Sequence, residues 1–433
     1  MAGKLKAPRN GLQRSPIQWL AKHQIGVSFN FILAIFACHI LLPWARPFTA
    51  RFFSLSGYNP VTGKYAIGFD DVYFVGFCVV LFSGIRAGSM EYLLVPLAKC
   101  CGLTNRQRLT RFSEQGWMIM YNAVFWTLGM RIYIASPYFL NLQELWTDWP
   151  QRELEGLTKG YVLAQLAYWT QQILVVNLEA RRHDYWQMIA HHLATTTLIT
   201  AAYAYHHIRV TNLIMVLMDI IELIFPLAKC LKYLGFTTIC DVLFGIFMVT
   251  WLVTRHLFYL MICWSVYYDL PQAMPTSCYQ GSGESLRGPV PVPDGWSYLI
   301  EPFRSPSGII CTNDAISMGF LCYLLTLQAI MIPWSMSIVR VAIRVVRGDN
   351  AEDVRSDDEE DEEVEEEEEE EEEEVREPVQ LVEKEVGAEA IDFEVWKRRN
   401  SVKGAARSSG ASLSRHSDRK ELLNRIGCER QIE

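Results

Sequence analysis

Over its first 345 residues the chain alternates between long apolar runs and short charged segments. A transmembrane helix needs about 20 mostly apolar residues, and eight runs meet or approach this length. They are Ile25–Trp44, Val72–Ala98, Trp117–Ala135, Tyr161–Leu178, Trp186–Tyr205, Val210–Leu231, Val242–Tyr267 and Ala315–Ile343. The pattern therefore predicts an all-α fold, a polytopic membrane helical bundle of about eight transmembrane helices.

The second run carries two charges, Arg86 and Glu91, whose spacing of five is poor for a helical pair. Either the two side chains line a cavity, or the run breaks between Gly84 and Gly88. We favour the break, because glycines weaken a helix interior.

Lysine and arginine in the loops predict the orientation of the bundle. With the N-terminus in the cytosol, the cytosolic loops hold 16 bases and the opposite loops hold nine. Cytosolic loops of membrane proteins are enriched in these residues, so we expect both termini in the cytosol. The predicted organisation is a cytosolic segment (1–24), two membrane spans (25–110), a catalytic membrane domain (111–345) and a cytosolic tail (346–433).

Two stretches on the opposite side look structured. Ser136–Gly160 carries aromatic residues among acids and prolines, which is typical of a segment at the membrane interface. Tyr268–Asp314 is rich in Pro, Gly and Ser and contains Cys278 and Cys311. In an oxidising compartment these two cysteines could pair, and two free thiols are an equal alternative.

The charge is concentrated in the tail. The net charge is −8, yet the block from Asp349 to Glu374 holds 20 acids and one base, so the rest of the chain carries +11. The like charges of residues 357–374 repel one another, so this segment is predicted to be disordered. Ser356 precedes three acids, a pattern that suits a casein kinase 2 type kinase, although a merely solvated tail explains the acids equally well. This distribution excludes a simple soluble enzyme, and we expect no nucleic-acid partner.

The fifth and sixth runs hold a cluster of polar residues. His191 and His192 are adjacent, and Asp219 and Glu222 are three apart, which places the two acids on one face of a continuous helix. At about 1.5 Å per residue, all four lie roughly 9–15 Å from the cytosolic ends of their spans. The imidazoles and carboxylates can therefore meet at one level, where they suit nucleophilic or general-base chemistry.

Other readings of this cluster remain open. Polar residues between transmembrane helices can simply hold the helices together. Adjacent histidines and carboxylates are also common metal ligands, but the repeated histidine boxes of membrane hydroxylases are missing, and we expect no metal. Arg255 lies mid-span, where an arginine is a candidate for substrate binding, although a structural ion pair with a carboxylate is favoured. Three bases near the cytosolic mouth could attract phosphates: Arg181, Lys229 and Lys232.

The same residues resemble the longevity-assurance (TLC domain) family, and specifically fungal ceramide synthases. The family signature starts with adjacent histidines and continues through an acid pair to an Ala-Lys and a Tyr. Here it reads His191, His192, Asp219, Glu222, Ala228, Lys229 and Tyr233. The resemblance runs from about Arg111 to Arg344. One departure is Glu222, where the family has Asp, which moves the carboxylate oxygens by one methylene.

The resemblance implies a sphingosine N-acyltransferase of the endoplasmic reticulum membrane. It would move a fatty acyl group from acyl-CoA, as co-substrate and without a cofactor, to the amine of a sphingoid base. His191 would carry the acyl group, and His192, Asp219 and Glu222 would manage protons. A small accessory subunit is implied for some fungal members, and homo- or hetero-dimers stay open. The alternatives are a non-enzymatic lipid sensor or transporter of the same fold and a metal-dependent lipid hydroxylase.

Overall fold

The computed structural model describes residue 19 and residues 22–178, 184–281 and 285–347. All of them belong to the first of two compact units, Met1–Glu360. The acidic run 357–374, Ser356 and the rest of the tail lie outside the described residues, as does Arg181.

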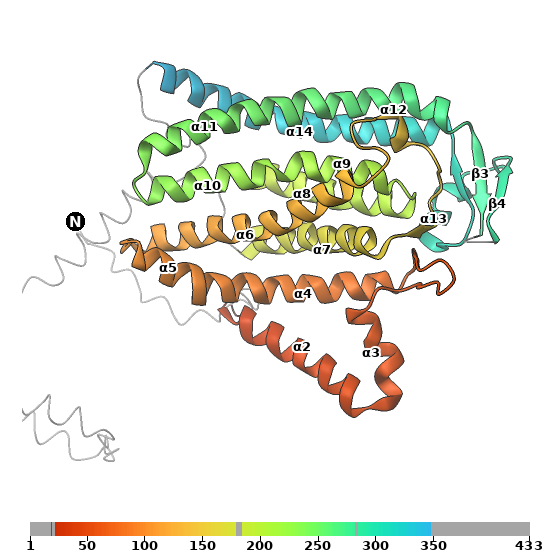
Figure 1. Cartoon of the computed structure of the whole chain (residues 1–433), viewed down its shortest axis with the longest axis horizontal. Helices are drawn as coiled ribbons and strands as arrows, with labels where there is room; N and C mark the ends of the chain where they lie inside the picture. Colours follow the sequence, from red (N-terminus) through yellow and green to blue (C-terminus); the bar gives the residue numbers. More distant parts are fainter. Residues whose placement is uncertain (1–18, 20–21, 179–183, 282–284, 348–433) are drawn as a thin grey trace, which may run out of the picture. The chain divides into compact units, whose positions relative to one another are not determined.

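The described unit is mainly helical (Figure 1). Its longer helices are α2 (Gln24–Leu41), α3 (Arg46–Phe53), α4 (Asp71–Ser89), α5 (Val95–Cys100), α6 (Arg106–Ile134), α7 (Gly156–Leu178), α8 (Tyr185–Ala204), α9 (Ile208–Asp219), α10 (Ile221–Tyr233), α11 (Thr237–Trp251), α12 (Tyr259–Ala273) and α14 (Asp314–Val346). Short helical segments are η1 (Pro43–Ala45), η2 (Met90–Leu94), η3 (Gln143–Leu145), η4 (Leu252–Phe258), η6 (Ser297–Leu299) and α13 (Glu301–Arg304). The strands are β1 (Tyr65–Ala66), β2 (Glu153–Leu154), β3 (Ser277–Gln280), β4 (Arg287–Val290) and β5 (Ile310–Thr312).

Each of the eight predicted spans falls on one of these helices or on a continuous series of them, and the fold class is confirmed. In the described part, four stretches are long and apolar enough to cross a membrane. They are Gln24–Leu41, Asp71–Cys100, Thr237–Ala273 and Asp314–Arg344. The chain is therefore a multi-pass membrane protein, and crossing by the more polar α6, α7, α8 and α9–α10 stays a prediction.

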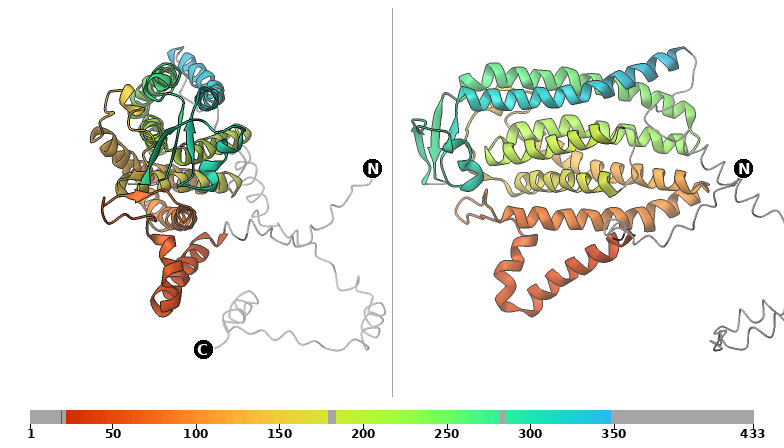
Figure 2. Two further views of the ribbon diagram at one scale, coloured as in Figure 1. Left: turned by 90° about the vertical axis from the view of Figure 1, so that its right-hand side faces the viewer. Right: turned by 180° about the vertical axis from the view of Figure 1, so that it is seen from behind.

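Polarity and burial separate the helices into outer and inner ones. On α2, Phe29 and Ile40 are more than 60% exposed, as expected for side chains that face lipid. On α7, Val162, Leu163 and Ala167 are at most 1% exposed. Figure 2 shows α7 among other helices in both views, whereas α2 diverges from α4. The polar residues of the inner helices can therefore face one another instead of lipid.

One sequence prediction of local structure is wrong. The second span does not break between Gly84 and Gly88, because α4 continues to Ser89 and a π-helical turn, η2, follows it. The third apolar run lies within a longer helix, α6, which begins at Arg106 because the Asn105 side chain accepts hydrogen bonds from two amides of the first turn and caps it.

Two further regions are the sixth span and the loop before β2. The span is not one helix, since Ile220 separates α9 from α10. Within Ser136–Gly160, Tyr138 and Trp146 are 4% and 3% exposed and belong to the core, and the position of this segment at the membrane interface stays a prediction. The Trp146 indole donates to Ser265 Oγ (2.9 Å) on α12, which satisfies its one polar group inside the protein.

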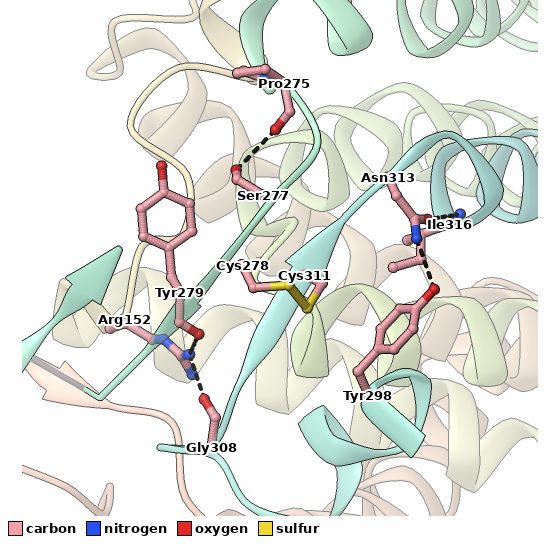
Figure 3. The surroundings of a disulfide bond; sticks show 10 residues. All are labelled: Arg152, Pro275, Ser277, Cys278, Tyr279, Tyr298, Gly308, Cys311, Asn313 and Ile316. Carbon is pink, nitrogen blue, oxygen red and sulfur yellow. Dashed lines mark hydrogen bonds between the residues drawn. A yellow bond between two sulfur atoms is a disulfide. The ribbon is translucent and has the colours of Figure 1, made fainter. Parts of the chain in front are cut away.

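A three-stranded sheet of order β4-β3-β5 covers one end of the bundle (Figure 1). Cys278 of β3 lies directly opposite Cys311 of β5, and a disulfide joins them (Figure 3). Arg152 donates to the carbonyl oxygens of Tyr279 (3.3 Å), Gly308 (2.8 Å) and Pro306 (2.5 Å). Three carbonyls on one guanidinium hold the sheet against the loop that precedes α7.

A buried ion pair attaches the first two spans to the rest of the bundle. Lys159 at the start of α7 is fully buried, and its Nζ lies 2.7 Å from Asp71 Oδ1 at the start of α4. The other oxygen of Asp71 accepts from the Tyr203 hydroxyl of α8 (2.9 Å). Because buried charges need partners, these three helices are held in one arrangement.

Candidate functional site

Two cavities meet inside the bundle. The first, the polar cavity, has an empty volume of about 1690 Å³ with its open mouth included, and its lining includes Arg86, Arg111, Glu114, Asp184, His192 and Lys229. The second, the apolar cavity, has an empty volume of about 830 Å³, again with its open part included, and its lining includes Leu198, Ile214, Val266, Leu270, Phe320 and Leu324. Four residues line both cavities: Trp169, His191, Glu222 and Arg255.

The histidine pair of α8 lies at this junction. His191 and His192 are 9% and 5% exposed, and their rings lie 6.1 and 5.5 Å from the ring of Trp169 on α7. His191 lines both cavities, whereas His192 lines only the polar one, because adjacent helical positions point about 100° apart.

The two imidazoles of α8 keep hydrogen-bonding atoms that no group in the described residues satisfies. Within the part of the chain that the structure describes, Nδ1 of His191 and Nδ1 of His192 have no hydrogen-bond partner. The same holds for Oγ1 of Thr195, which lies one helical turn after His191 and lines the apolar cavity. Buried polar atoms without partners are rare, so these atoms are suited to contact a ligand.

Glu222 and Arg255 form the opposite wall of the junction. Glu222 Oε1 lies 3.2 Å from Arg255 Nη2, and the guanidinium lies 4.6 Å from the centre of the Trp251 ring. Arg255 is 4% exposed and also donates to the carbonyl of Met218. It belongs to the π-helical turn η4, a departure from regular helix that is frequent at functional sites. The structure therefore pairs Arg255 with a carboxylate.

Asp219 has different neighbours from Glu222. It is 1% exposed, and its Oδ2 accepts from Gln165 Nε2 of α7 at 2.6 Å. It lines neither cavity. Asp219 ends α9 and Glu222 stands in the first turn of α10. Ile220 between them keeps helical dihedrals (φ −59°, ψ −35°), yet the two carboxylates contact different partners.

No hydrogen bond joins either imidazole to either acid among the residues described. His191 and Glu222 thus share a cavity, and Asp219 lies behind them against α7. Neither carboxylate orients an imidazole directly in this arrangement.

The predicted substrate-binding bases are placed differently from one another. Lys229 lines the polar cavity, with its Nζ 4.8 Å from the centre of the Phe225 ring. Lys232 is exposed and lines neither cavity. Arg181 lies outside the described residues.

Sequence reasoning missed several lining residues. They are Trp169, Thr195, Arg111 and Glu114, and no local motif marks them. Arg86 of α4 is 8% exposed and lines the polar cavity, so the charge within its apolar run was a usable signal. In the described residues, no group of three or more His, Cys, Asp or Glu side chains is arranged to hold a metal ion.

Comparison with known proteins places the chain. Residues 111–340 match the TLC domain. A ceramide synthase of Gibberella moniliformis is 52% identical over 325 residues, which are 75% of this chain and 76% of that protein. The chain belongs to the TLC domain family, within its ceramide synthases.

Two further relatives agree with this membership. A sphingosine N-acyltransferase-like protein of Alternaria alternata is 41% identical, covering 82% of this chain and 81% of the relative. A sphingosine N-acyltransferase of Schizosaccharomyces pombe is 38% identical, covering 80% and 82%. The TLC region contains the histidine pair, both acids and Arg255, whereas Arg86 precedes it and comes from the second span.

Proposed function

We propose that this chain transfers a fatty acyl group from acyl-CoA to the amine of a sphingoid base. The relatives named sphingosine N-acyltransferase support the acceptor. The observation that carries the proposal is the position of His191 at the junction of the two cavities. In acyl-CoA, the thioester carbonyl carbon joins the polar, anionic CoA to the apolar acyl chain, so the substrate has the same two parts as the paired cavities. The polar cavity offers Arg111 and Lys229 to phosphates, and the apolar cavity offers a sheath for the chain.

The transfer takes two steps at His191. In the first, an imidazole nitrogen attacks the carbonyl carbon of the thioester, the C–S bond breaks, and the imidazole proton passes to the CoA thiolate. In the second, the unprotonated sphingoid amine attacks the acyl-imidazole and the C–N bond to His191 breaks. The proton that the amine releases returns to the imidazole, so the products are CoA and the N-acyl base.

The neighbouring residues have distinct roles in this proposal. His192 faces the polar cavity, where it can accept the proton of the incoming ammonium. The pair of Glu222 and Arg255 fixes the charge opposite His191. Asp219 acts as a positioning residue, since its bond to Gln165 holds the end of α9 against α7.

The first experiment tests the acyl carrier. Purified protein receives acyl-CoA without the sphingoid base, and intact mass and released CoA are measured. We expect one acyl group on the protein and one CoA released, both absent in His191→Ala and both retained in the control Lys232→Ala, whose side chain lies outside the cavities. An acylated His191→Ala protein would refute this assignment.

The second experiment adds the sphingoid base. If N-acyl product forms without CoA release in its absence, then His191 or His192 acts as a general base in a single direct transfer. If neither the purified protein nor the membranes of expressing cells, where an accessory subunit is available, make N-acyl product, the non-enzymatic lipid-binding role replaces the enzyme.

We also propose a location and regulation for this enzyme. The excess of basic loop residues supports cytosolic termini, and an endoplasmic reticulum membrane would present the polar cavity to cytosolic acyl-CoA. Phosphorylation of Ser356 by a casein kinase 2 type kinase would add charge beside the last span. Dimerisation or an accessory subunit would use the lipid-facing helices. Protease protection of tagged termini tests the orientation.

A further inference from the structure

The apolar cavity has a polar group at the end that is farthest from His191. Three helical segments line the cavity along its length. At the end near the catalytic histidine they contribute His191 of α8, Glu222 of α10 and Leu327 of α14. At the other end they contribute His207 of the turn after α8, Thr211 of α9 and Phe320 of α14. At about 1.5 Å per residue, roughly 20 Å separates His191 from the end of α8. The cavity is therefore elongated, and His207 and Thr211 lie at its distal end.

Aromatic rings surround His207. Its ring stacks on Trp149 at 6.2 Å and meets Trp146 and Phe320 edge-on at 6.1 and 5.1 Å. The disulfide-linked sheet lies beyond this group, since Tyr279 of β3 (Figure 3) packs edge-on against Trp149 at 5.8 Å. The rings, with the sheet packed against one of them, keep His207 in place.

The imidazole of His207 makes no hydrogen bond with the residues that the structure describes, although it lines the cavity. Its neighbour His206 is satisfied, with Nδ1 2.8 Å from the carbonyl of Gln151 and Nε2 3.4 Å from Arg152. The indoles of Trp149 and Trp146 donate to Tyr205 O and to a serine, so they are also satisfied.

His207 is suited to a neutral polar ligand. Burial lowers its pKa to about 4, so the imidazole is uncharged at neutral pH and offers one donor and one acceptor. The Thr211 hydroxyl donates to the His207 carbonyl (2.8 Å) and keeps lone pairs that can accept. A hydroxyl is the group that both can engage, because it donates one hydrogen bond and accepts others.

We propose that this distal end is a subsite for a hydroxyl group near the terminal carbon of the acyl chain. Hydroxylated long-chain acyl thioesters would thus be preferred donors. The proposal rests on the proposed function, in which the acyl chain occupies the apolar cavity. The carbonyl carbon lies at His191 and the far end of the chain reaches His207, so the hydroxyl contact depends on chain length.

The test compares matched pairs of acyl-CoA donors, each pair of equal length, with and without a terminal hydroxyl. The measured quantity is the ratio of kcat/KM for the hydroxylated donor to that for the plain donor. We expect wild type to show a maximum in this ratio at one chain length. In His207→Phe, which keeps an aromatic ring, the ratio should fall roughly fivefold to tenfold. In His207→Gln, which keeps a donor and an acceptor, it should largely recover.

The possible results either support or overturn the distal hydroxyl subsite. An unchanged ratio in His207→Phe overturns the proposal, as does a wild-type ratio that is flat across chain lengths. If His207→Phe does not fold, the length profile of wild type still gives the answer. Absence of product from plain donors would instead refute the proposed function.

Discussion

The buried pair of Lys159 and Asp71 predicts that the spans before the TLC region are integral to its stability. Lys159 Nζ lies 2.7 Å from Asp71 Oδ1 and donates to the carbonyls of Ser56 (2.8 Å) and Ala66 (2.7 Å). Both side chains are at most 4% exposed, so water cannot replace either partner.

The expected change in the free energy of unfolding depends on which charge each substitution leaves buried. Removing one partner of a buried ion pair costs about 3–5 kcal/mol, because the other charge stays buried without compensation. Lys159→Met should cost about 3 kcal/mol, at the lower end. Asp71 would still accept from Ser56 (2.8 Å), Gly68 (2.8 Å) and Tyr203 (2.9 Å). Lys159→Met combined with Asp71→Leu should cost less than the sum of the two single changes.

The assay is thermal unfolding of the purified protein in detergent, followed by fluorescence. For a chain of this size about 3 kcal/mol corresponds to a fall of roughly 5 °C in Tm. The matched control is Arg51→Met, which breaks an ion pair with Asp70 of similar length (3.0 Å) in which both side chains are over 40% exposed. An exposed pair contributes about 0–1 kcal/mol. Equal Tm values for Lys159→Met and Arg51→Met would refute the reasoning, and so would strict additivity in the double variant.

Two further predictions concern the sheet that covers the distal end. Cys278→Ser removes a crosslink between residues 33 apart, so we expect the free energy of unfolding to fall by about 3.5 kcal/mol. A reducing agent should lower the Tm of wild type but not that of the Cys278→Ser variant. Equal sensitivity of the two proteins would contradict a stabilising role of the disulfide. Burial and Arg152 lower the pKa of His206 to about 3. The unfolded chain therefore binds more protons between pH 3 and 6.5, and stability should fall by about 2 kcal/mol from this group between pH 6.5 and 5. His206→Asn, which tolerates the left-handed backbone there (φ 58°), should flatten this part of the Tm–pH curve, and an unchanged slope would assign it to other groups.

Much of the fold could be predicted from local patterns. The eight apolar runs all fall on helices, and for the four that are long and apolar enough to cross a membrane the cost of exposing backbone groups to lipid requires a helix. The histidine pair and Glu222 stand out because polar residues are costly in such runs and need a reason to be there.

The tertiary structure decided which of these residues share a site. Asp219 accepts from Gln165, whereas Glu222 pairs with Arg255 and lines the cavities with His191, although the two acids are only three positions apart. Arg86 reaches the polar cavity from a helix outside the TLC region, and Cys278 pairs with Cys311 because β3 and β5 are neighbours.

The difference between what the sequence determined and what the tertiary structure decided has a physical cause. The sequence alone determined where helices form and which residues are too polar for lipid, since both depend on neighbours within a few turns. The tertiary structure decided which side chains face a common space, because this depends on helix rotations, breaks and packing partners from distant segments. His191 could be recognised from its surroundings in the sequence, but its position between a polar and an apolar cavity exists only in the packed bundle.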